Sequence, residues 1–151
     1  MKNLKIVQFS ALAMTLSCSA VTHAECKGSQ NLPSEQTHVA FAVNSSQISN
    51  SERNRLREWV FSINSKYAIQ NWITIIGGAS EGEHKPQPLA MNRAVAVARD
   101  ALADGLVKAP LQLKTQTWPD GKSGSQSSDS REVTVQISPG CPNNCCNDQK
   151  R

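Results

Sequence analysis

Residues 72–78 read Trp-Ile-Thr-Ile-Ile-Gly-Gly, and this stretch decides the fold of the chain. Its first five residues are nearly all apolar, which is typical of a strand that is buried on both faces at the centre of a sheet. The two glycines that follow end the strand. We therefore expect a sheet built around residues 72–76, with the other elements arranged on either side.

Three further stretches have the alternation of apolar and polar residues that indicates a half-buried strand. They are residues 37–43, residues 111–118 and, most clearly, residues 131–137. The Gly/Ser-rich stretch between the last two strands predicts a loop. The sequence therefore predicts four strands in all.

Two stretches have helical spacing instead. The first helix is expected to begin after Ser49, because a serine followed three residues later by a glutamate has the pattern of a capping box. The second is expected to begin at Leu89, because Pro86 and Pro88 argue against helix before that point. Gly105 stands where a helix C-cap glycine belongs.

The order strand, helix, strand, helix, strand, strand predicts an α/β fold of the α+β sandwich type. Two helices should cover one face of a mixed four-stranded sheet, with a right-handed βαβ crossover. We expect residues 1–24 to be a signal peptide, 25–36 a polar lead-in, 37–138 the folded domain and 139–151 a Cys-rich tail.

Four stretches, taken in order, resemble the OmpA/MotB C-terminal family. Residues 41–48 are similar to the family's first strand and the turn after it, and residues 75–80 to its second strand and the loop that usually reads Gly-x-Thr-Asp. Residues 89–94 resemble the Leu-Ser-x-x-Arg-Ala that opens its second helix, and residues 130–133 its last strand. The resemblance covers the whole expected domain.

The family binds peptidoglycan, so the resemblance implies a non-catalytic, peptidoglycan-associating module. In the family, a loop Asp and a helix Arg hold the diaminopimelate of the stem peptide, the carboxylate facing the ammonium and the guanidinium facing the carboxylate. Arg93 matches that arginine. In the first turn of the expected helix it would also lie near free N–H groups that favour anions.

The loop departs from the family pattern. Ser80 stands at the position of the Asp, with Glu81 beside it, and the loop is shorter. The resemblance implies that Ser80 or Glu81 completes the pocket around Arg93 and that Arg131 supports it. The alternative is that the fold is kept and the ligand site is lost. The chain would then be a disulfide-stapled component of an envelope assembly, such as a secretion, pilus or conjugation machine.

The N-terminus has the pattern of a secretory signal peptide. A basic start is followed by an uncharged stretch over residues 6–21, which is too short and polar for a membrane span, and residues 22–24 suit a cleavage site. We expect the protein to be exported to the periplasm, where it could associate with the outer membrane. Lipidation of Cys18 is the competing interpretation, although Thr15 stands where such sites usually have Leu.

Four cysteines remain after the expected cleavage: Cys26, Cys141, Cys145 and Cys146. In an exported protein, disulfides are the expected state. We expect Cys26 to pair with a tail cysteine, Cys141 being within range if the first and last strands are antiparallel neighbours. The other two would pair with each other or with a partner chain or second copy. A four-thiolate zinc site is the rival interpretation.

Charge and motifs argue against several classes of function. The chain has a net charge of +4, and without Lys2 and Lys5 there are 14 basic against 12 acidic residues, with no basic stripe suited to nucleic acid. The sequence predicts no cofactor, no metal and no catalysis. A thiol-redox enzyme would be the alternative, but it needs a reactive free thiol, and no C-x-x-C motif is present.

Overall fold

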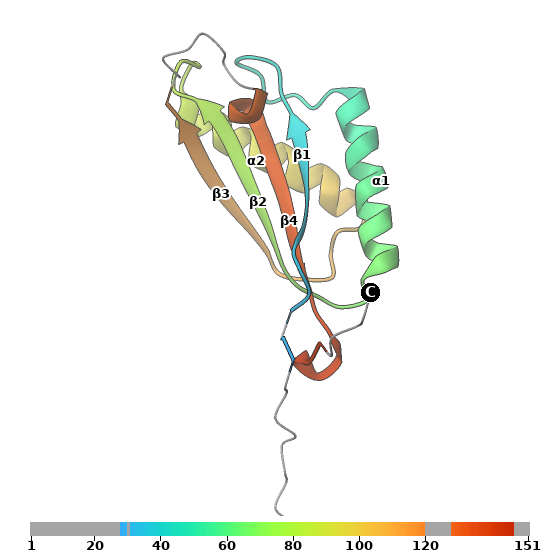
Figure 1. Ribbon diagram of the computed structural model, residues 1–151. Helices are drawn as coiled ribbons and strands as arrows, with labels where there is room; N and C mark the ends of the chain where they lie inside the picture. Colours follow the sequence, from blue (N-terminus) through green and yellow to red (C-terminus); the bar gives the residue numbers. More distant parts are fainter. Residues whose placement is uncertain (1–27, 30, 120–127, 147–151) are drawn as a thin grey trace, which may run out of the picture.

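The computed structural model describes residues 28, 29, 31–119 and 128–146. In this part of the chain, helices α1 (Asn50–Lys66) and α2 (Pro86–Ala103) lie on the same face of one sheet (Figure 1). The sheet has the order β1-β4-β2-β3, formed by β1 (Glu35–Ala40), β2 (Gln70–Ser80), β3 (Leu111–Trp118) and β4 (Glu132–Pro139). The predicted fold class is therefore confirmed.

Strand β2 occupies the centre of the sheet, as predicted. It runs parallel to β3 and antiparallel to β4, so Ile73 pairs with Leu111 on one side and with Ile137 on the other. Ile73 is 0% exposed and points into the core beneath the helices, whereas Trp72 is 37% exposed. Burial on both faces was therefore wrong at Trp72, because both helices lie on the opposite face of the sheet.

The start of α1 is fixed by a side-chain cap. Ser49 Oγ accepts a hydrogen bond from the backbone N–H of Glu52 at 3.2 Å, as the sequence pattern predicted. The Glu52 carboxylate accepts from the backbone N–H of Ala40 at 2.9 Å. The glutamate thus ties the first turn of α1 to the end of β1.

Ion pairs connect α1 to the last turn of α2 and to its C-cap residue, Asp104. Arg53 Nε lies 2.9 Å from Asp100 Oδ2, and Arg57 Nε lies 3.1 Å from Asp104 Oδ1. Both pairs step by four residues in the same direction, so the helices run parallel. The end of α2 carries Gly105 at a φ of 96°, which confirms the predicted C-cap glycine.

Helix α2 begins at Pro86, earlier than the predicted Leu89. A proline in the first turn removes an N–H that has no partner within the helix, so both Pro86 and Pro88 are tolerated there. Strand β2 likewise continues to Ser80. The loop between β2 and α2 is therefore confined to residues 81–85.

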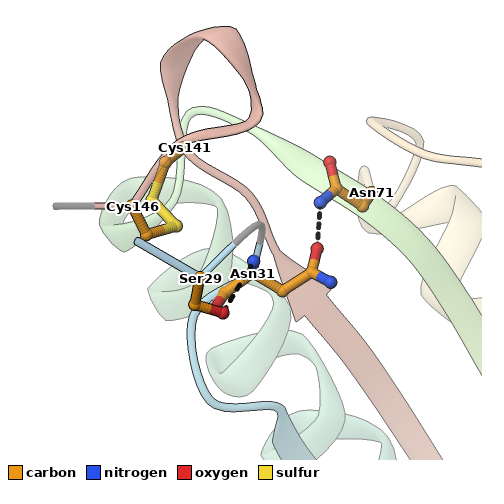
Figure 2. Close-up of a disulfide and its surroundings, with 5 residues drawn as sticks. All are labelled: Ser29, Asn31, Asn71, Cys141 and Cys146. Carbon is orange, nitrogen blue, oxygen red and sulfur yellow. Dashed lines mark hydrogen bonds between the residues drawn. A yellow bond between two sulfur atoms is a disulfide. The ribbon is translucent and has the colours of Figure 1, made fainter. Parts of the chain in front are cut away.

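The segments before β1 and after β4 meet at one end of the sheet, as the strand order predicted. The backbone N–H of Cys146 donates to Ser29 O at 2.8 Å, and the N–H of Leu32 donates to Pro139 O at 3.0 Å. Figure 2 shows this junction, in which the side-chain amide of Asn71 also donates to Asn31 Oδ1.

A disulfide closes the tail upon itself. Cys141 is bonded to Cys146, because the short helix η2 (Pro142–Asn144) turns the chain back and brings their Cα atoms within 5.1 Å (Figure 2). A bond between Cys141 and Cys26 is therefore not formed. Cys145 is also disulfide-bonded. Cys26 itself, Cys18 and the expected signal peptide lie outside the described residues.

The helices of the described part are short or polar by the standard of membrane spans. Neither α1 nor α2 is long and apolar enough to cross a bilayer.

Candidate functional site

Arg93 is a fully buried charged side chain at the end of the sheet where β2 meets α2. It is 0% exposed. Its Nε donates to Ser45 O at 2.8 Å, Nη1 to Gly78 O at 2.9 Å and Nη2 to Ala42 O at 3.1 Å. Two further bonds go to Glu83, so all five N–H groups of the guanidinium have an acceptor inside the protein.

Glu83 forms a bidentate ion pair with Arg93. Its Oε1 lies 2.6 Å from Nη2 and its Oε2 lies 2.8 Å from Nη1, the parallel fork in which an arginine binds a carboxylate most strongly. The carboxylate also accepts from the backbone N–H groups of Asn44 at 2.7 Å and Ser80 at 3.1 Å. Both charged side chains are 0% exposed.

These contacts keep the carboxylate of Glu83 ionised. Burial raises its pKa, but the hydrogen bonds from Arg93, Asn44 and Ser80 outweigh burial, and the net direction is downward. The ring of Phe41 lies 5.4 Å from the guanidinium carbon of Arg93 and adds a cation–π contact. The pair is therefore a satisfied buried ion pair rather than two charges awaiting a ligand.

Local backbone features bring the two loops to this point. Asn44 has a φ of 54°, a left-handed conformation that asparagine tolerates, and its side-chain oxygen accepts from the N–H of His84 at 2.7 Å. Gly77 faces α2, and a Cβ there would overlap the carbonyl oxygen of Ala90. A glycine at position 77 thus lets α2 approach β2 closely enough for Arg93 to reach the strand.

The predicted site residues are only partly brought together. Arg93 lies where the site was expected, but α2 begins earlier than predicted, so Arg93 lies beyond the first turn and away from free helix N–H groups. Ser80 is 2% exposed and contributes its backbone N–H to Glu83. Glu81 is exposed, and Arg131 is half-buried at the end of η1 (Ser128–Arg131).

Glu83 was missed by the sequence reasoning, which looked for a carboxylate at positions 80 and 81. A signal was available, because a glutamate three residues after Ser80 can turn back over the strand end within a tight loop. That loop closes with a hydrogen bond from the N–H of Glu83 to Ser80 O at 3.0 Å. The direction of the side chain depends on the loop, and the sequence alone does not give it.

The sheet order and helix placement define an α+β domain, and several solved structures share this fold. An OmpA-like domain of FopA1 from Francisella tularensis is 21% identical, covering 71% of this chain and 73% of its own, with a TM-score of 0.52. The C-terminal domain of MotB from Helicobacter pylori is 16% identical, covering 70% and 87%, with a TM-score of 0.57. The peptidoglycan-associated lipoprotein from Burkholderia pseudomallei is 18% identical, covering 66% and 88%, with a TM-score of 0.53.

The chain has the fold of OmpA-like domains, as the four stretches that resemble the OmpA/MotB C-terminal family predicted. No protein-family model matches it, and no curated protein sequence does either. At these identities the likeness concerns the fold. The chemistry of the site has to be argued from the residues of this chain.

Proposed function

We propose that this chain is a non-catalytic module of the periplasm that acts as an interaction component of an envelope assembly, with its peptidoglycan site closed from within. The observation that carries the proposal is that Arg93 is fully buried with all five N–H groups satisfied. Glu83 occupies the position that a ligand carboxylate would need. The neighbours of similar fold support a place in the envelope.

The energetic cost of opening this site is large. A stem-peptide carboxylate has to displace Glu83 and leave it without its partner, and breaking a buried ion pair costs about 3–5 kcal/mol. That cost corresponds to an affinity loss of roughly 10²- to 10⁴-fold. A ligand bound through Arg93 would therefore bind weakly even if the remaining contacts of the family were present.

A second candidate is peptidoglycan binding itself. It is favoured by the retention of Arg93 at the position that the family resemblance assigns to the ligand, and by the fold shared with a peptidoglycan-associated lipoprotein. This function requires Glu83 to leave the guanidinium. The two candidates thus differ in whether the pair between Glu83 and Arg93 opens.

A sacculus pulldown separates the two candidates. The oxidised protein without its predicted signal peptide is mixed with insoluble peptidoglycan, and the lipoprotein from Burkholderia pseudomallei serves as the positive control. We expect no retention of the unmodified chain. Retention that is lost in Arg93→Met, but kept in Arg57→Gln on the surface of α1, would overturn the closed site and establish the second candidate.

A further inference from the structure

A polar groove lies between the start of α1 and the middle of α2, on the helical side of the molecule. It has a volume of about 510 Å³. Its lining includes Gln47, Ile48, Arg53, Asn92, Val95 and Arg99. The two arginines are the only charged residues of the lining in the described part of the chain, so the groove has no carboxylate of its own on its surface.

The charges behind the groove do not balance. Asp100 accepts from Arg53 Nε at 2.9 Å and from Arg99 Nε at 3.3 Å, so one carboxylate serves two guanidinium groups. The Asp100 side chain is 13% exposed, against 37% for Arg53 and 73% for Arg99. One positive charge therefore remains at the accessible surface of the groove.

The terminal nitrogens of these arginines are available to an outside acceptor. Among the described residues, the only hydrogen bond from them is a long one, from Arg53 Nη1 to Asn50 Oδ1 at 3.3 Å. Because Nε of Arg53 and Nε of Arg99 donate to the two oxygens of the same Asp100 carboxylate, the two guanidinium groups lie close enough together to bind one further carboxylate. Arg93, by contrast, has no donor left.

An apolar wall accompanies the arginines. Val95 is 49% exposed in the middle of α2, and Ile48 closes the floor at 8% exposed. A ligand that fits has a carboxylate for the guanidinium groups and an aliphatic side chain for Val95. Acidic peptides that carry aliphatic residues have this chemistry.

We infer that this groove binds an acidic, aliphatic peptide segment of a partner protein. A carboxylate is held between Arg53 and Arg99, and an aliphatic side chain packs on Val95. This inference rests on the proposed function. If the chain acts by binding another envelope protein rather than peptidoglycan, the groove is where that protein would bind.

The test is an NMR titration of the oxidised protein with two capped tetrapeptides, acetyl-Glu-Leu-Glu-Leu-amide and its Gln-Leu-Gln-Leu counterpart. The acidic peptide should shift the resonances of Val95, Asn92 and the Nε–H of Arg99, and the neutral peptide should not. Arg53→Gln and Arg99→Gln should each weaken binding about tenfold, since each removes a charge-assisted contact.

Two further variants keep the test decisive. Arg57→Gln, which removes an exposed arginine of the same helix outside the groove, should leave the affinity unchanged. Asp100→Asn removes the competing carboxylate and should tighten binding several-fold. Equal shifts with both peptides, or equal losses in Arg57→Gln and Arg99→Gln, would overturn the inference.

The sacculus pulldown distinguishes this inference from the proposed function. If the acidic peptide fails to bind and the chain is also not retained on peptidoglycan, only the groove inference fails. If the chain is retained on peptidoglycan and Arg53→Gln with Arg99→Gln abolishes retention, the groove holds a cell-wall ligand. In that case both the acidic peptide partner and the interaction role are overturned.

Discussion

At one end of the sheet a buried ion pair joins two loops to α2. At the opposite end, where β1 begins and β4 ends (Figure 1), a disulfide closes the tail. The ion pair depends on the ionisation of Glu83 and is not affected by reducing agents. The disulfide depends on an oxidising environment and is not affected by mild acid. Agents that loosen one end should therefore leave the other intact.

The largest effect is expected from Arg93→Met. The substitution leaves the carboxylate of Glu83 buried without its partner, and such losses cost about 3–5 kcal/mol of unfolding free energy. Urea denaturation monitored by circular dichroism measures it. The double variant Glu83→Leu with Arg93→Met removes both charges and should recover part of the loss. A loss below about 1 kcal/mol in the single variant would contradict the role of the pair.

Removal of the tail disulfide should have a smaller effect. The bond between Cys141 and Cys146 closes a short loop, with a sequence separation of 5. Chain-entropy estimates for a loop of this size give about 2 kcal/mol. Cys141→Ser with Cys146→Ser should lower the urea midpoint accordingly. Combined with Arg93→Met, the losses should add, since distant sites that share no partners behave independently. Strong non-additivity would show that the two ends are coupled.

Much of the fold was predictable because its determinants are local. The cap at Ser49, the glycine at position 105 and the apolar run of β2 each act through neighbours in sequence. The start of α2 was predicted too late, because proline was taken as a helix breaker although it is acceptable in a first turn.

The site was less predictable because its contacts are long-range. Arg93 was predicted to bind a ligand, and whether it does stays a prediction. Its partners in the structure come from three separate segments: the loop after β1, strand β2 at Gly78 and the loop before α2 at Glu83. Whether such an arginine pairs with its own protein or stays accessible to a ligand depends on whether a loop folds so that a carboxylate faces it. Pairing of the tail cysteines likewise depended on the turn made by η2 rather than on cysteine spacing.

Acid should loosen the ion-pair end selectively. The folded state lowers the pKa of Glu83, so the pair's contribution is present above the unfolded value near 4.3 and is lost as the pH falls through the folded value. One such group gives a slope of at most about 1.4 kcal/mol per pH unit. Urea midpoints measured between pH 7 and pH 3 should fall more steeply for the unmodified chain than for Glu83→Gln. Parallel pH profiles would exclude Glu83 as the acid-sensitive group.

The smallest expected effect lies near the disulfide end, where a second carboxylate offers a matched control. Hydrogen bonds from Lys66 and Tyr67 lower the pKa of Glu35, with Lys66 Nζ 2.6 Å and Tyr67 Oη 2.5 Å from its Oε1. The Glu35 side chain is 33% exposed, however, and water screens the pair. Glu35→Gln should cost about 0.5 kcal/mol at pH 7, and added salt should erase that difference.

The same salt series should leave the cost of Glu83→Gln nearly unchanged, because buried pairs are screened much less than exposed ones. The measurement is the urea midpoint of both variants at low and high NaCl. Equal salt sensitivity of the two would mean that solvent reaches Arg93. The site around Arg93 would then be open enough to admit a ligand, and peptidoglycan binding would become the favoured function.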